Sequence, residues 1–174
     1  MNKKIIGLTT LTLLCSSLPS FAGVYVGAGL GYFRIEDQDF LDEDNDLKDD
    51  RAAWKLYGGL DLGDIFSLEV SHVEFGDIKD EPLQLEADGE TIAALLGFPI
   101  GDSRLYAKAG QLYWNADATI ANTVNVSDDG NDTFYGIGAR VGGDEGVGVK
   151  LEFEHYELGN ADIDMPSISL NMEF

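Results

Sequence analysis

The sequence predicts an all-β fold, an eight-stranded antiparallel up-and-down transmembrane β-barrel. Three observations support this prediction. Eight stretches alternate apolar residues with polar or small ones at a period of two, as strands do. Short and long connections between these stretches follow one another in turn. Glycine and charged residues share one face of the stretches and apolar residues occupy the other, as in a barrel that presents its apolar face to lipid.

The first residues have the organisation of an export signal. Lys3 and Lys4 give a basic start, and the apolar run from Ile5 to Leu14 is too short for the roughly 20 residues of a spanning helix. Small residues at Ser20 and Ala22 suit a cleavage site after Ala22. We therefore expect residues 1–22 to be a signal peptide and residues 23–174 to be the barrel domain. An N-terminal membrane anchor is the alternative.

Composition limits what the mature chain can do. Cleavage would remove Cys15, the only cysteine, so no disulfide or cysteine-ligated metal site is expected. It would also remove two lysines and change the net charge from −21 to −23. Such a charge repels nucleic acid, so no nucleic-acid partner is expected. No cofactor is expected either.

The alternating stretches supply the strands. They cover 24–32, 54–62, 66–71, 92–98, 105–110, 135–141, 147–154 and 167–174. Their even number is typical of bacterial outer membrane barrels. Many aromatic residues fall near the predicted ends of the strands, where amphipathic rings suit a membrane interface. These are Phe66, Phe98, Tyr106 and Phe174 at one end, and Tyr32, Trp54, Tyr113, Trp114, Tyr135 and Tyr156 at the other.

The connections divide into two classes. Tight turns are expected at 63–64, 99–103 and 142–146, and long loops at 36–50, 76–90, 115–132 and 157–165. Most of the 32 acidic residues lie in the four long segments. An outer membrane barrel has brief periplasmic turns and longer outside loops, so this pattern predicts four acidic extracellular loops.

A soluble periplasmic barrel with an apolar interior is the alternative fold. It would require the face that carries Lys108, Arg140 and Glu152 to meet water around the perimeter. The same face carries many glycines, which make room for crowded side chains inside a narrow barrel. The membrane barrel is therefore favoured.

Several stretches together give a family resemblance across nearly all the mature chain. They are 25–32 (YVGAGLGY), 54–59 (WKLYGG), 69–76 (EVSHVEFG), 96–100 (LGFPI) and 169–174 (SLNMEF). In order and spacing they resemble the transmembrane barrel of the OmpA-type outer membrane family. The resemblance implies an outer membrane location, a charged network inside the barrel that includes Glu69, Arg140 and Lys150, and a C-terminal insertion signal at Phe174. Leu95 departs from the pattern, because the best-known member carries a lysine inside the barrel there.

Interior charges are expected to pair, because an unpaired buried charge is costly. The predicted barrel-interior charge network contains Glu69, Lys108, Arg140, Lys150, Glu152 and Glu154. In it we expect the glutamates to face Lys108, Arg140 and Lys150, with Lys55 near Asp61.

Other candidate sites are weaker. His72 adjoins Ser71, but neighbouring strand residues point to opposite faces, and His155 has no serine nearby, so no catalytic residues are predicted. The acidic run with Asp42, Asp44 and Asp46 lacks the full calcium-loop pattern. It suggests at most weak binding of divalent cations, for example as a bridge to lipopolysaccharide. No other metal site is predicted. The run at 128–132 is similar.

The functional prediction is a barrel that serves as an anchor in the cell outer membrane, with a structural or surface-interaction role and no enzymatic activity. Its expected partners are outer membrane lipid and lipopolysaccharide, the insertion machinery during assembly and an unknown extracellular ligand. A narrow ion or small-solute channel is the alternative, and a lipid A-modifying barrel enzyme is the third hypothesis.

Overall fold

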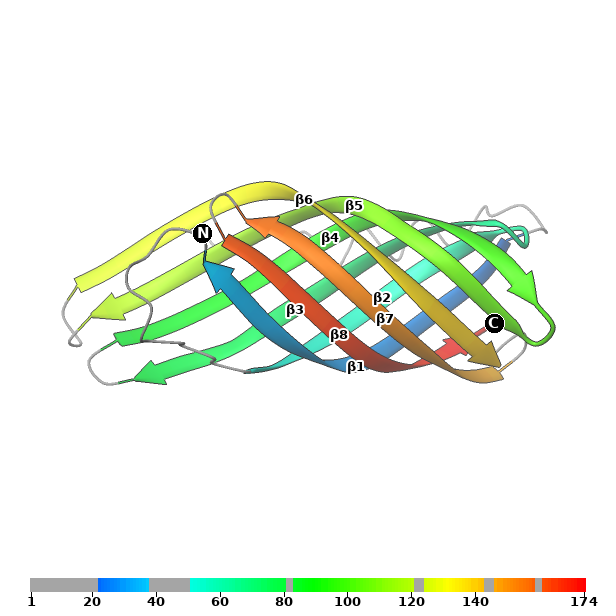
Figure 1. Ribbon diagram of the computed structural model, residues 1–174, viewed down its shortest axis with the longest axis horizontal. Helices are drawn as coiled ribbons and strands as arrows, with labels where there is room; N and C mark the ends of the chain where they lie inside the picture. The colour runs from blue at the N-terminus through cyan, green and yellow to red at the C-terminus, as the bar shows by residue number, and fades with distance from the viewer. Residues whose placement is uncertain (1–21, 38–50, 81–82, 121–123, 143–145, 159–160) are drawn as a thin grey trace.

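A computed structural model describes residues 22–37, 51–80, 83–120, 124–142, 146–158 and 161–174 (Figure 1). The described chain forms eight antiparallel strands that close into a barrel in sequence order. The strands are β1 (Ala22–Asp37), β2 (Arg51–Leu62), β3 (Phe66–Asp80), β4 (Leu83–Ile100), β5 (Ser103–Ile120), β6 (Val124–Gly142), β7 (Gly146–Leu158) and β8 (Ala161–Glu173). The predicted fold class is confirmed.

One end of the barrel, here called the turn end, carries the connections β2–β3, β4–β5 and β6–β7. Gly63 and Gly101 have positive φ angles of 79° and 59°, which glycine adopts without steric cost. They let β2 and β4 reverse within a few residues. The start of β1 and the end of β8 lie at the same end, because Ala22 pairs with Leu62 and Tyr25 pairs with Glu173. The opposite end is called the hairpin end.

Alternation along the strands separates the two faces of the wall. Outward residues are apolar and exposed, with Leu30 67% and Ile137 66% accessible. Inward residues are packed in the lumen, where Lys108 is only 2% accessible. An exposed apolar band around the whole barrel is unsuited to water. This arrangement excludes the soluble barrel with an apolar interior.

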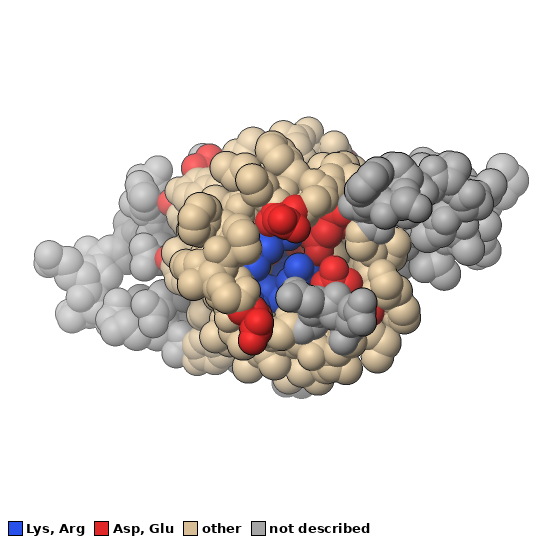
Figure 2. Space-filling view, turned by 90° about the vertical axis from the view of Figure 1, so that its right-hand side faces the viewer, with Lys and Arg blue, Asp and Glu red and all other residues tan. Residues whose placement is uncertain are grey.

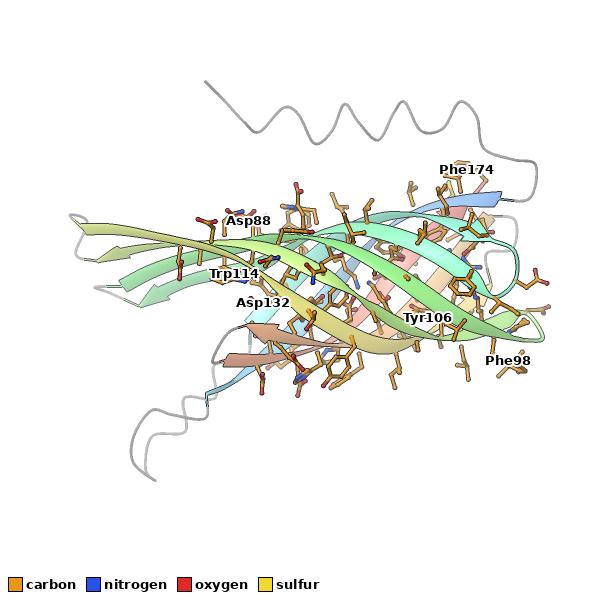
Figure 3. All side chains as sticks on the ribbon, turned by 90° about the horizontal axis from the view of Figure 1, so that it is seen from above. Asp88, Phe98, Tyr106, Trp114, Asp132 and Phe174 are labelled. Atoms are coloured by element: carbon orange, nitrogen blue, oxygen red, sulfur yellow. The ribbon has the colours of Figure 1, made fainter. Side chains whose placement is uncertain are left out.

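Two of the four predicted long loops, 76–90 and 115–132, are largely strand, and the described part of 157–165 is strand as well, whereas most of 36–50 lies outside the described residues. β3 and β4 continue to Asp80 and from Leu83, and β5 and β6 continue to Ile120 and from Val124. As a result β3–β6 extend beyond the other strands at the hairpin end (Figures 1 and 3). The loop prediction was wrong here because outside the membrane no strand face needs to be apolar. The alternation that marks a membrane strand therefore fades while backbone pairing continues.

Three of the predicted rim aromatics point inward and not toward a membrane interface: Tyr106, Tyr156 and Trp114, which packs against the buried core. Tyr106 and Tyr156 are 6% and 0% accessible and lie in the lumen, because each is two residues from an inward charge, Lys108 or Glu154. Phe98 and Phe174 do point outward at the turn end (Figure 3). The described residues include no helix long and apolar enough to cross a membrane.

Candidate functional site

The centre of the lumen holds a closed ring of alternating charges. Its cations are Lys55 (β2), Lys108 (β5) and Lys150 (β7), and its anions are Glu69 (β3), Glu152 and Glu154 (β7). Lys55 and Lys150 each contact two of the carboxylates, and Lys108 contacts all three, the third being Glu152 at 3.7 Å. The Lys55 ammonium lies 2.6 Å from Glu152 and 2.7 Å from Glu154. The Lys108 ammonium lies 2.7 Å from both Glu154 and Glu69. The Lys150 ammonium lies 2.6 Å from Glu69 and 3.3 Å from Glu152, which closes the ring.

This ring is almost dry. Each of the six side chains is at most 2% accessible. Charges so deeply buried are tolerated only where they are paired and hydrogen-bonded. Glu69 gains a further hydrogen bond from the Tyr25 hydroxyl at 2.9 Å, and Lys150 lies over the Tyr57 ring at 4.1 Å from its centroid. The ring is therefore a compact neutral plug across the barrel.

A second charged cluster lies nearer the turn end. Asp61 accepts hydrogen bonds from Arg104 and Arg140, each at 2.8 Å, and from the Ser67 hydroxyl. Arg140 also lies 3.3 Å from Glu173. The four charged residues of this cluster line a recess of about 310 Å³ that opens at the turn end. Figure 2 looks into this end and shows Lys and Arg side chains inside the opening with acidic side chains around them.

An apolar layer lies on the other side of the ring. Phe134 and Tyr156 stack with ring centroids 5.1 Å apart, and Phe75 meets Tyr156 edge-on at 5.9 Å. Val73 and Leu112 are fully buried beside them. The lumen is thus filled in three layers: apolar at the hairpin end, ionic in the middle, and an arginine–aspartate cluster at the turn end.

The partners of two charges differ from the prediction. Lys55 is not near Asp61: six residues along one strand separate them by roughly 20 Å, so Lys55 instead reaches across the lumen to β7. Arg140 does not face the ring glutamates. It pairs with Asp61 and Glu173 instead. The residue of β6 opposite Glu154 is Gly136, and Arg140 lies four residues nearer the turn end, too far along the strand to reach the ring. Glu69, Lys108, Lys150, Glu152 and Glu154 lie together.

Arg104 was not singled out from the sequence, although it shares the inward parity of Lys108 on β5. Asp61 and Lys55 were considered only as a pair. Counting Glu173, the described lumen carries five cations and five carboxylates in these two clusters. The need for equal numbers of positive and negative side chains could have pointed to Arg104 from the sequence, because a lumen this dry disfavours an excess of either charge.

Glycines on the lumen face make room for tyrosines. Tyr25 is the register partner of Gly59, and Tyr57 is the register partner of Gly27. In each pair a Cβ on the glycine would overlap the ring of the tyrosine opposite. Tyr106 and Gly138 repeat the arrangement between β5 and β6. Each of the three tyrosine rings lies over the glycine of the neighbouring strand and helps to fill the lumen.

The family model described as the outer membrane protein beta-barrel domain matches residues 8–174. The chain belongs to this family of outer membrane β-barrels. Outer membrane protein A of Escherichia fergusonii is 26% identical over 112 residues, which is 62% of this chain and 32% of that protein. Outer membrane protein A of Shigella dysenteriae matches to the same extent. The chain thus spans about a third of the length of these relatives.

Solved structures share the fold at low sequence identity. Ail, the attachment invasion locus protein of Yersinia pestis, solved in complex with the heparin analogue sucrose octasulfate, has a TM-score of 0.67 at 13% identity and covers 88% of this chain and 99% of its own. Neisserial surface protein A has a TM-score of 0.72 at 12% identity, with 87% and 97% covered. The N-terminal barrel of Pseudomonas aeruginosa OprF has a TM-score of 0.59 at 16% identity, with 85% and 97% covered. The family establishes an outer membrane β-barrel, and these solved structures share its fold.

The histidines of this outer membrane barrel lie on its outer face. His72 packs against Trp54, with ring centroids 5.6 Å apart, whereas Ser71 points into the lumen and shares a hydrogen bond with Thr91. Ser71 and His72 therefore form no hydroxyl–imidazole pair. The His155 Nδ1 lies 2.7 Å from Asp164 and beside the Tyr135 ring.

The remaining predicted site residues are an exposed terminus and an acidic run. Phe174 is 76% accessible, and its backbone N–H donates to the Val24 carbonyl at 2.9 Å. Asp42, Asp44 and Asp46 lie outside the described residues. Within the described part of the chain, no three His, Cys, Asp or Glu side chains are grouped so that they could hold a metal ion.

Acidic side chains gather at the hairpin end. Trp114 and Asp132 lie together on the extended part of β5 and β6, where the indole N–H donates to the carboxylate at 2.7 Å (Figure 3). Asp88 points outward from β4 (Figure 3). Other described acids at this end are Glu74, Glu90, Asp128, Asp129, Glu157, Asp162 and Asp164.

Proposed function

We propose that the chain is a non-conducting anchor that displays an acidic surface outside the outer membrane. The turn end faces the periplasm in this proposal, because outer membrane barrels have short periplasmic turns and longer outside connections. The extended strands β3–β6 then stand outside the membrane. The observation that carries the proposal is this protruding acidic sheet, which takes the place of the loops expected at 76–90 and 115–132.

The filled lumen supports the non-conducting part. An ion crossing the barrel would have to pass Asp61 with its arginines, the dry ring around Lys108, and the packed rings of Phe134 and Tyr156. Eight-stranded barrels have an interior just wide enough for side chains. We therefore assign the charge network, Glu69, Lys108, Lys150, Glu152 and Glu154 with Lys55, a structural role.

The acidic surface supports the interaction part. Loops and hairpins that a rigid scaffold holds outside the membrane commonly carry binding functions. Ail was solved with a heparin analogue, a polyanion. The described acids at the hairpin end of this chain would repel such a ligand, so we propose a partner with positive charge or one bridged by divalent cations, such as lipopolysaccharide.

Phe174 supports a role in assembly. Its ring is exposed at the turn end, beside the first residues of β1. We propose that this terminal aromatic is the signal read by the insertion machinery, and that residues 1–22 are the signal peptide that directs export.

Surface labelling tests the orientation. Cys15 is the only cysteine, so D129C at the hairpin end and D64C at the turn end each add one defined thiol. In intact cells, a membrane-impermeant maleimide should label D129C and leave D64C unlabelled until the outer membrane is permeabilised. Labelling of D64C but not D129C in intact cells would overturn the proposed display surface.

A narrow channel is the second candidate, and the open recess at the turn end is the observation that favours it. Planar-bilayer recording separates the two candidates. The purified protein should give no current above the lipid background, because the recess ends at Arg104 and Arg140. Reproducible unitary currents would instead establish the channel.

A further inference from the structure

One edge of the protruding sheet is open. β6 pairs with β5 in an unbroken register from Ser103↔Val141 to Ile120↔Val124. Its pairing with β7 reaches only Phe134↔Tyr156. Over the described residues, Val124–Asp132 therefore has a neighbouring strand on one side alone, and Thr133, whose hydroxyl donates to Glu157 of β7 at 3.5 Å, ends this segment, Val124–Thr133. This segment is called the β6 edge below.

The direction of its backbone groups follows from one hydrogen bond. The Gly142 N–H donates to the Asp102 carbonyl at 3.0 Å, so even-numbered residues of β6 bond to β5. Nearer the turn end, the odd-numbered residues of β6 bond to β7. Along the β6 edge, which β7 does not cover, the N–H and C=O groups of the odd-numbered residues point away from β5. Asp129 agrees with this, because its N–H donates to the Asp128 carboxylate at 3.0 Å instead of to a strand.

The two sides of the protruding sheet are not equivalent. On the β3 side the register shifts between Phe75 and Ile78, and such an irregularity twists an edge away from pairing. The β6 edge has no such shift against β5, and its sequence VNVSDDGNDT contains neither proline nor lysine, which commonly protect edges. It remains a regular template for another strand.

Charge decides which strand can pair there. Asp128 and Asp129 are exposed on the β6 edge, and Asp132 lies close by. A second copy of the same edge would bring these carboxylates against one another, which is unfavourable. A strand with lysine or arginine side chains would gain both the backbone hydrogen bonds and the opposite charge.

From this geometry we infer that the β6 edge, Val124–Thr133, is a docking site for an extended cationic polypeptide that adds a ninth strand to the protruding sheet. Backbone pairing supplies the affinity and the aspartates select the charge. The inference rests on the proposed outside display of this sheet, and it specifies the class of partner.

A synthetic peptide tests the inference. The probe is a fluorescein-labelled peptide with five Lys-Val repeats, matched to the length of the β6 edge, added to the protein in phosphatidylcholine nanodiscs. Fluorescence anisotropy should show saturable binding. Hydrogen exchange should slow in residues 124–133 more than elsewhere. A peptide with N-methyl groups on alternate residues, or with Glu in place of Lys, should not bind measurably.

Matched variants separate strand pairing from charge. N131P removes one outward N–H of the β6 edge and keeps the β5 ladder, whereas N131A keeps that N–H, and both lose the contact of Asn131 with Gln111. N131P should bind the peptide about three- to tenfold more weakly than N131A, the loss expected for an edge hydrogen bond. D128N/D129N should weaken binding more than D88N/E90Q, which removes the same charge from β4.

The results that would overturn the inference are specific. Equal binding by the N-methylated peptide, or by N131P and N131A, would reduce the site to a diffuse acidic surface. Absence of binding while D129C is labelled in intact cells would reject the docking site and leave the proposed display intact. Failure to label D129C would reject the display itself.

Discussion

The Lys108 ammonium lies 2.7 Å from a Glu154 carboxylate oxygen, although β5 and β7 are separated by β6 in the barrel wall. The contact therefore crosses the lumen instead of following the sheet. Lys108 also holds Glu69 on β3. One side chain thus joins β3, β5 and β7, no two of which are neighbours, and so ties opposite parts of the wall together.

Replacing Lys108 should be severely destabilising. K108M keeps most of the side-chain volume but leaves Glu69, Glu152 and Glu154 each with one cation fewer in a dry lumen. We expect a loss of about 3–5 kcal/mol in the free energy of unfolding, the usual cost of breaking a buried ion pair. Urea unfolding in lipid vesicles, followed by tryptophan fluorescence, measures it. K108M/E154Q should recover part of the loss, and a K108M barrel as stable as the wild type would contradict the plug.

Asp61 should behave differently, because its cluster borders the open recess. D61N removes the carboxylate shared by Arg104 and Arg140. Arg140 keeps a second partner in Glu173 at 3.3 Å. We expect a smaller loss of about 1–3 kcal/mol. Unfolding measured at low and high salt gives the distinguishing result: added salt should shrink the effect of D61N but not that of K108M, because the recess admits ions. Equal salt dependence of the two variants would contradict the layered lumen.

The sequence predicted which face each membrane residue occupies better than it predicted contacts. A period of two is set by the backbone, so the inward positions of Lys108 and Lys150 could be read directly. The partner of Lys55 could not, because it depends on how strands are staggered around the closed barrel. The extent of β6 beyond the membrane was missed for another reason: Asp128 and Asn131 give no alternation when both faces of a strand are polar.

The lipid-facing assignment can be tested on β8 and β5. Leu170 is 62% accessible and lies between Ala28 and Val149 of the neighbouring strands, within the apolar band. L170R should cost about 2–4 kcal/mol, as arginine does near the bilayer midplane. Q111R, on the outer face nearer the hairpin end, should cost about 0–1 kcal/mol. Both variants are refolded into vesicles of one lipid and unfolded with guanidinium chloride. If L170R were the milder change, the band would be misplaced.

Two neighbouring glycines of β2 should differ in how strongly they respond to the same substitution. Gly59 faces the lumen, where a Cβ would overlap the Tyr25 ring, whereas the atom nearest to a Cβ at Gly58 is 3.7 Å away, an ordinary contact on the lipid face. G59V should destabilise the barrel by about 1–3 kcal/mol, the usual cost of overpacking. G58V should change the free energy of unfolding by no more than about 0.5 kcal/mol.

The cause can be isolated by removing the ring that Gly59 accommodates. Tyr25 also donates a hydrogen bond to Glu69, so displacing its ring would disturb the charge ring as well. Y25A alone should therefore be destabilising, but it should cost less when G59V is already present, because the overlap has then been relieved. A double-mutant cycle of unfolding free energies measures this coupling. Strict additivity of G59V and Y25A would show that the glycine is required for something other than space for tyrosine.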